Sequence, residues 1–240
     1  MKSQIIAFEG LDCCFKETNY NEFLKRIKEY SPFIKTRTGL KNIKQESFPR
    51  YECWTGTAVR KWLNGDLDRK FMLNHPMAIN STYYLDRVSY WHETVDGEKN
   101  IDLYNEGNNL FVFDRYMTSS SIYNPIENGK LSETDFSFEP AYFGSPKPDI
   151  VVWLRMRDFE VIKELLSKKE NKDKNELDFN FLYGAWERSE YMIGNSNLLG
   201  FETKLIVINL LDINRNIKSR EALGEEIFLK LTRACDLINI

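Results

Sequence analysis

The sequence contains few side chains that could hold a metal ion or form disulfide bonds. Its 240 residues include only four cysteines and two histidines. Their spacing matches no metal-binding pattern, so we expect free thiols in a reducing compartment and a cytoplasmic location. The residues concerned are Cys13, Cys14, Cys53, Cys235, His75 and His92.

The sequence also lacks long apolar runs and an excess of basic residues. No run approaches the ~20 residues that a membrane-spanning helix needs. The formal net charge is -3 at pH 7 and the pI is about 5.6, so we expect no membrane span and no broad surface for nucleic acid. The opening MKSQIIAFEG soon reaches Glu9, which favours a first strand over a signal peptide.

Length and apolar content favour one compact domain spanning residues 1–240. Hydrophobic residues make up 42% of the chain. Short apolar runs alternate with segments of helical spacing, which predicts a parallel sheet covered by helices, with ligands at the carboxyl ends of its strands. The expected strands are residues 4–10, 32–38, 108–116, 147–156 and 204–210; the expected helical segments are 17–30, 55–65, 69–95, 158–169, 178–195 and 219–238.

The stretch FEGLDCCFKET follows the first expected strand and opens the first helix. It departs from the phosphate-binding pattern G-x-x-x-x-G-K-[ST] at two positions. Gly10 and Lys16 have the right spacing, but Phe15 replaces the second glycine and Glu17 replaces the hydroxyl residue. Loop N–H groups, the helix N-terminus and the lysine charge would still form an anion site. The predicted ATP-phosphate residues are Gly10, Cys13, Cys14, Phe15, Lys16, Glu17 and Thr18.

A second group of polar residues ends the most apolar strand, LFVFDRY. Asp114 could hold Mg²⁺ through water, and Glu17 offers a second carboxylate for the metal. Arg115 could bind a phosphate with two parallel hydrogen bonds. An ordinary ion pair at the end of a strand is the alternative interpretation of Asp114 and Arg115.

Taken together, these stretches resemble the thymidylate kinases, the P-loop enzymes that phosphorylate dTMP. FEGLD, FPRY, TGTAVRKWLNG, the helix with Arg87, DRYMTSSSIYN and PKPDIVVWLRM occur in the family's order over most of the chain. The resemblance implies a P-loop NTPase-type α/β fold, with about five parallel strands, helices on both faces and a short lid near residues 168–178. It also implies ATP and Mg²⁺ as cofactors, and a homodimer that uses a helix such as Ala78–Trp91.

The resemblance assigns roles to residues of the acceptor site. Lys16, Asp12 and Arg115 would be the catalytic residues, with Asp12 on the 3'-hydroxyl and Arg115 on the acceptor phosphate. Phe48 would stack on the base and Arg87 would reach a base carbonyl. Core packing for the aromatic residues and a surface charge for Arg87 are the alternatives. The predicted substrate residues are Asp12, Phe48, Pro49, Arg50, Arg87, Arg115, Ser120, Tyr123 and Asn124.

Three departures from the family leave the activity open. Phe15 and Glu17 alter the phosphate loop, and the lid sequence NKDKNELD lacks an arginine, so charge there would rest on Lys168, Lys169, Lys172 or Lys174. We therefore expect a kinase that transfers the γ-phosphate of ATP to a pyrimidine deoxynucleotide, dTMP first. The alternatives are a catalytically impaired relative that binds a nucleotide as a regulatory or structural component, and a nucleoside kinase with Glu9 as its base.

Overall fold

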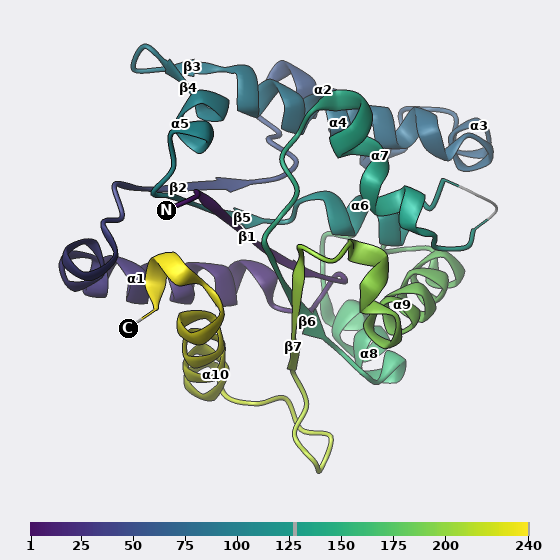
Figure 1. The fold of residues 1–240 in the computed structure, drawn as a ribbon. Coiled ribbons are helices and arrows are strands. Elements are labelled where there is room, and N and C mark those ends of the chain that lie inside the picture. Colours follow the sequence, from purple (N-terminus) through teal and green to yellow (C-terminus); the bar gives the residue numbers. More distant parts are fainter. Residues whose placement is uncertain (127–128, 240) are drawn as a thin grey trace.

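The computed structural model describes residues 1–126 and 129–239. A five-stranded parallel sheet, in the order β2-β5-β1-β6-β7, forms its centre (Figure 1). The elements are β1 Gln4–Gly10, α1 Lys16–Thr38, β2 Asn42–Ser47, α2 Trp54–Asn64, α3 Arg69–Asn74, α4 Pro76–His92, β3 Thr94–Val95, β4 Glu98–Lys99, α5 Asn100–Glu106, β5 Asn109–Asp114, α6 Met117–Tyr123, α7 Glu133–Phe143, β6 Ile150–Arg155, α8 Phe159–Lys168, α9 Phe179–Gly194, η1 Ser196–Leu199, β7 Lys204–Asn209, α10 Arg220–Ala234 and η2 Asp236–Ile238.

Helices cover both faces of the sheet, as the sequence predicts. Helices α1 and α10 lie on one face, and α4, α5 and α6 lie on the other (Figure 1). Because strand side chains alternate between faces, Ile6 and Phe8 of β1 pack in the core under α1, whereas Ile5 and Ala7 pack in the second core. Both faces of the central strands are therefore buried, which explains their nearly continuous apolar sequence.

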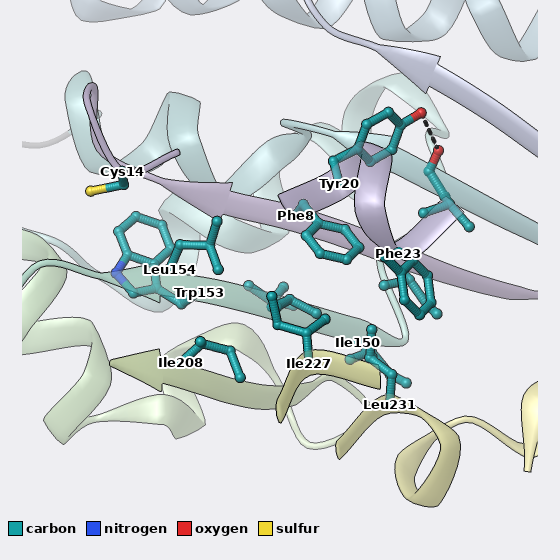
Figure 2. Packing of buried hydrophobic residues seen from close by; sticks show 14 of the residues in the cluster. Phe8, Cys14, Tyr20, Phe23, Ile150, Trp153, Leu154, Ile208, Ile227 and Leu231 are labelled. Atoms are coloured by element: carbon teal, nitrogen blue, oxygen red, sulfur yellow. Dashed lines mark hydrogen bonds between the residues drawn. The ribbon is translucent and has the colours of Figure 1, made fainter. Parts of the chain in front are cut away.

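Aromatic side chains fill the core between the sheet and α1. The ring of Phe8 packs against Tyr20 and Phe23 with centroid separations of 5.9 and 5.3 Å. Ile227 and Leu231 of α10 belong to the same cluster (Figure 2). The Tyr20 hydroxyl lies within hydrogen-bond distance of the backbone carbonyl oxygens of Glu46 and Val112. This packing fixes α1, and hence the loop before it, against the sheet.

The prediction of a strand over residues 32–38 is wrong, because α1 continues through Pro32 to Thr38. Ile34 is buried and lies seven residues after Ile27, on the same helical face. The Thr36 hydroxyl donates to the carbonyl four residues earlier, at 2.9 Å. The second strand of the chain is instead the polar edge strand β2.

Other predicted elements are confirmed. Helix α8 begins after Asp158, whose carboxylate accepts the N–H of Glu160. The mixed stretch 69–95 divides into α3 and α4 at Pro76, which occupies the first turn of α4. All four cysteines are free thiols, and no helix within the described residues is long and apolar enough to cross a membrane.

Candidate functional site

The loop between β1 and α1 keeps a tight left-handed turn although glycine is missing from it. Phe15 has φ 52° and ψ 34°, a conformation that glycine adopts freely and a bulky residue adopts at a cost of about 1–2 kcal/mol. The side chain of Phe15 packs against the main hydrophobic cluster. The left-handed turn is therefore present with phenylalanine at this position, and the ring packs against the core.

The start of the loop is held close to β6. A Cβ on Gly10 would lie 2.8 Å from the carbonyl oxygen of Leu154, so only glycine fits there. Cys14 is buried, and burial raises the pKa of its thiol to about 11, which makes it a packing residue. Cys13 is half-buried, with φ 61°. Glu17 is exposed in the first turn of α1, where the N–H groups have no acceptor within the helix.

Lys16 lies within the curve of the loop. Its Nζ donates to the carbonyl of Leu11 at 2.6 Å, and the residue is only 8% exposed. Burial, together with the nearby charge of Arg115, lowers the pKa of Lys16. Its ammonium group is thus held on a backbone carbonyl of the loop that precedes α1.

Asp12, Arg115 and Tyr123 form one hydrogen-bonded group at the carboxyl ends of β1 and β5. Arg115 Nη2 lies 2.5 Å from Asp12 Oδ1, and the Tyr123 hydroxyl donates to Asp12 Oδ2 at 2.7 Å. Burial alone would raise the pKa of Asp12, but Arg115 and Lys16 lower it overall, so the carboxylate stays ionised. Arg115 has φ 62°, a strained conformation that aims its side chain back at the loop.

These three residues border a cavity of about 230 Å³. Phe48, Arg87 and Ser120 line it as well, so segments far apart in the sequence meet around one space. Of the predicted substrate residues, the structure brings eight together here: Asp12, Phe48, Pro49, Arg87, Arg115, Ser120, Tyr123 and Asn124.

Arg50 is the predicted substrate residue that lies elsewhere. Its guanidinium bonds Asp86 through Nε at 3.2 Å and Glu93 through Nη1 at 2.6 Å. Its Nη2 donates to the carbonyl of Asp86 and to the hydroxyl of Ser89. Arg50 therefore ties the FPRY segment to α4 and borders a neighbouring open groove that also contains Asp114.

Several residues that line the cavity were missing from the sequence prediction. Tyr83 lies one helical turn before Arg87, so helical spacing alone could have identified it. Leu63 lies in α2, a helix that the sequence predicted, and the others come from loops and the short helix α6, where the sequence offers no period to follow. The additional lining residues are Tyr51, Leu63, Tyr83, Tyr116, Ser119, Asp173, Asn175 and Glu176, together with Lys169, which the sequence analysis named only as a possible source of lid charge.

The last of these belong to the segment between α8 and α9, which the sequence marked as a lid. Lys169 Nζ lies 2.6 Å from Glu176 Oε1, so the basic residue of this segment that lines the cavity is already paired. Asp173 accepts the backbone N–H groups of Asn175 and Glu176, and burial raises the pKa of its carboxyl. Lysine here supplies charge without the two-pronged geometry of arginine.

Asp114 is a better candidate for a metal ligand than Glu17. Its Oδ2 accepts from the Ser47 hydroxyl at 3.3 Å, whereas its Oδ1 is buried and has no hydrogen-bond partner among the described residues. Over that same part of the chain, no three acidic, histidine or cysteine side chains converge on one point. Mg²⁺ needs only one or two carboxylates when phosphates and water supply the other ligands, so Asp114 is compatible with it.

Glu9 is engaged by the start of α6. It is 0% exposed, its Oε1 accepts the N–H groups of Tyr116 and Thr118 at 3.0 Å, and its Oε2 accepts from the Ser119 hydroxyl. A carboxylate that is buried and already accepts these bonds is not placed to take a proton from a substrate. The structure therefore gives no support to Glu9 as a catalytic base.

The parallel sheet, its strand order and the loop between β1 and α1 define a P-loop NTPase-type fold of the kind found in nucleotide kinases. The crystal structure of thymidylate kinase from Ehrlichia chaffeensis is similar, with a TM-score of 0.59 and 16% sequence identity. The similarity covers 96% of this chain and 100% of that one. No protein-family model matches the sequence, and no curated protein matches it either.

Proposed function

We propose that the chain is a nucleoside monophosphate kinase that transfers the γ-phosphate of ATP to a pyrimidine deoxynucleotide, with dTMP, giving dTDP, as the first candidate. The observation that carries the proposal is the meeting of Asp12, Arg115 and Tyr123 beside the phosphate loop, at the border of a cavity that Phe48 and Arg87 also line. An anion-binding loop next to a cavity with an aromatic ring suits a nucleotide acceptor.

Phosphoryl transfer depends on alignment and charge neutralisation, which the residues in place can provide. Lys16 and the first-turn N–H groups of α1 would hold the donor phosphates, and Arg115 would hold the acceptor phosphate. Asp114, with Glu17 as a second candidate, would hold Mg²⁺, which neutralises phosphate charge when bound. No general base is required, because the attacking phosphate oxygen is already anionic.

A coupled assay with ATP, Mg²⁺ and a panel of nucleoside monophosphates tests this function. The panel is dTMP, dUMP, dCMP, dGMP, dAMP and UMP. We expect turnover of a pyrimidine deoxynucleotide, and its loss in Arg115→Met. Because Arg157 is exposed beyond the end of β6 and does not line the cavity, Arg157→Met is a matched control for the loss of one arginine. No turnover with any acceptor would contradict the kinase proposal.

A second candidate function is a nucleotide-binding protein with little or no catalysis. Two observations favour it: the Glu17 carboxylate lies in the first turn of α1, and both Arg115 and Lys169 are neutralised by carboxylates. This candidate predicts that dTMP raises the melting temperature of the protein although no ADP is formed. Measuring both quantities on one preparation separates the two functions.

A homodimer also stays a proposal. Seven of the 17 residues of α4, the helix that the sequence offered for it, are buried within their own chain, whereas Leu85 is 43% exposed. Sedimentation of wild type and Leu85→Asp would test it: we expect a dimer that the charge dissociates. A wild-type monomer at micromolar concentration would contradict it.

A further inference from the structure

Helix α6 supplies much of the cavity wall, although it is short and its sequence is a poor helix former. It has seven residues, MTSSSIY. Isolated helices shorter than about 12–15 residues are marginal in water, and serine and threonine have low helix propensity. Yet Ser119, Ser120 and Tyr123 of this helix line the cavity, and so does Asn124, which follows it. The placement of these side chains therefore depends on contacts that other parts of the chain make with α6.

The carbonyl end of α6 is held by side chains from two other helices. The last C=O groups of a helix have no partner within it. Arg188 of α9 donates from Nε to the carbonyl of Ile122 at 2.6 Å and from Nη2 to that of Tyr123 at 3.3 Å. Asn80 of α4 donates to the carbonyl of Asn124 at 2.8 Å. A guanidinium charge also suits the negative pole of a helix, so Arg188 stabilises the last turn of α6.

Helix α9 contacts Tyr123 through a second side chain. The two helices α6 and α9 lie next to each other (Figure 1). Phe181 stacks on the ring of Tyr123 with a centroid separation of 5.9 Å and an interplanar angle of 23°. Because Phe181 and Arg188 are seven positions apart in α9, they lie on the same face of that helix. One face of α9 thus holds both the backbone and the ring of Tyr123.

The hydroxyl of Tyr123 connects this arrangement to the phosphate loop. It donates to the carboxylate of Asp12 and accepts the backbone N–H of the same residue. Arg188 is partly buried and does not line the cavity, whereas Tyr123 and Asp12 do. Any effect of Arg188 on a molecule in the cavity must therefore pass through the residues that it holds.

We propose that Arg188 is a positioning residue: by holding the last turn of α6 it fixes the Tyr123 hydroxyl on Asp12, and so raises the affinity of the cavity for its nucleotide. The inference rests on the proposed function and deepens it. Without the guanidinium, the carbonyls of Ile122 and Tyr123 would turn to water, and the last turn of a weak helix would fray. The Tyr123 hydroxyl would then spend less time on Asp12.

Calorimetric binding of dTMP, without ATP, tests the proposal. Arg188→Met removes the donors and should raise the dissociation constant roughly tenfold, the cost of about one hydrogen bond. Arg188→Lys keeps the charge and should recover part of the affinity. Arg157→Met is the matched control, because Arg157 also donates to a backbone carbonyl, but to that of Asp212, and does not line the cavity. This control should bind dTMP like wild type.

A double-mutant cycle with Tyr123→Phe tests the route of the effect. When the Tyr123 hydroxyl is already absent, Arg188→Met should weaken dTMP binding by less than about threefold, because the link to Asp12 has been cut. An equal weakening in the wild-type and Tyr123→Phe backgrounds would show that Arg188 does not act through this hydroxyl. That result overturns the inference.

A purely structural role for Arg188 predicts a different result. Arg188→Met would then lower the melting temperature, while the folded protein bound dTMP with the wild-type dissociation constant; this outcome also overturns the inference. If Arg188→Met does not fold, Arg188→Lys and Arg188→Gln, which both keep a donor, take its place in the cycle. Wild-type affinity in both of these variants again overturns the inference.

The test distinguishes this inference from the proposed function itself. Wild type that does not bind dTMP contradicts the function, and the inference with it. Wild type that binds dTMP, together with an Arg188→Met variant of unchanged affinity, contradicts the inference alone.

Discussion

The hydroxyl of Tyr123 is bonded to Asp12 twice. It donates to Oδ2 at 2.7 Å and accepts the backbone N–H of Asp12 at 3.1 Å. One side chain of α6 thus fixes both the orientation of the Asp12 carboxylate and the backbone of the phosphate loop. Changes at Tyr123 should therefore affect the loop as well as the cavity.

Tyr123→Phe should lower the free energy of unfolding by about 1–2 kcal/mol, since it leaves Asp12 short of two partners. The ring that stacks on Phe181 at 5.9 Å is retained, so packing is preserved. We also expect weaker binding of dTMP, measured by calorimetry. Tyr183→Phe removes a hydroxyl from a side chain that is 43% exposed and serves as the control. Equal effects of the two variants would contradict the role of the Asp12 contact.

Lys169→Met should lower kcat roughly tenfold, a loss of about 1.4 kcal/mol of transition-state stabilisation. Lys169 lines the cavity, and a phosphate could replace its partner Glu176, whereas Lys168, at the end of α8, does not line the cavity. Lys168→Met should therefore keep the wild-type rate. Steady-state kinetics with ATP and the best acceptor measures both. Identical rates for the two variants would show that the lid lysine has no part in transfer.

Replacing Phe15 should reveal the cost of its backbone conformation. Because Phe15 lies at φ 52°, Phe15→Gly should be more stable than Phe15→Ala by about 1 kcal/mol. Both variants lose the ring, so their difference isolates the backbone. At the exposed mid-helix position Lys25 the order should reverse by a similar amount, about 1 kcal/mol in favour of alanine. Urea unfolding measures all four; an alanine preference at both positions would contradict a left-handed Phe15.

Glu9 should make stability fall as pH rises. Burial raises the pKa of its carboxyl above the usual 4.5, although Ser119 and Arg115 oppose this. Between 4.5 and that raised pKa, the folded state holds a proton that the unfolded state has released, so the free energy of unfolding declines with pH. Relative to Glu9→Gln, wild type should therefore lose stability above pH 4.5. Urea unfolding from pH 4 to 7 checks this, and a difference that grows with pH would show a lowered pKa instead.

Apolar strands could be predicted from the sequence, and the polar strand β2 could not. The runs around Val112 and Val152 are apolar because both faces of those strands are covered. The edge strand β7, KLIVIN, also has an apolar sequence, whereas the edge strand β2, NIKQES, has no buried residue and almost no apolar signal. The β-branched residues Ile34, Thr36 and Thr38 follow a proline, and this pattern led to the wrong prediction of a strand over residues 32–38. Core contacts and hydroxyl bonds to the helix backbone override that propensity.

Site residues in motifs at the ends of strands were predicted from the sequence. Residues that reach the site from other parts of the chain were not. Asp12 and Arg115 follow directly from the ends of two adjacent strands. Glu139 carries no local signal in the sequence, because its buried carboxylate contacts Arg87, a residue 52 positions earlier in the chain. The same holds for Arg50, whose motif suggested a ligand contact while Asp86 and Glu93 hold it against α4.

The segment over the cavity is fastened to the cavity wall. Arg69 of α3 donates to Asn175 at 2.9 Å and to Asp178 at 3.1 Å, and the N–H of Lys174 donates to the carbonyl of Leu63. Leu63 and Asn175 both face the same space. For the proposed nucleotide ligand, these bonds would have to break before release on this side of the cavity. Arg69, which does not line the cavity, would then influence the dissociation rate without contacting the ligand.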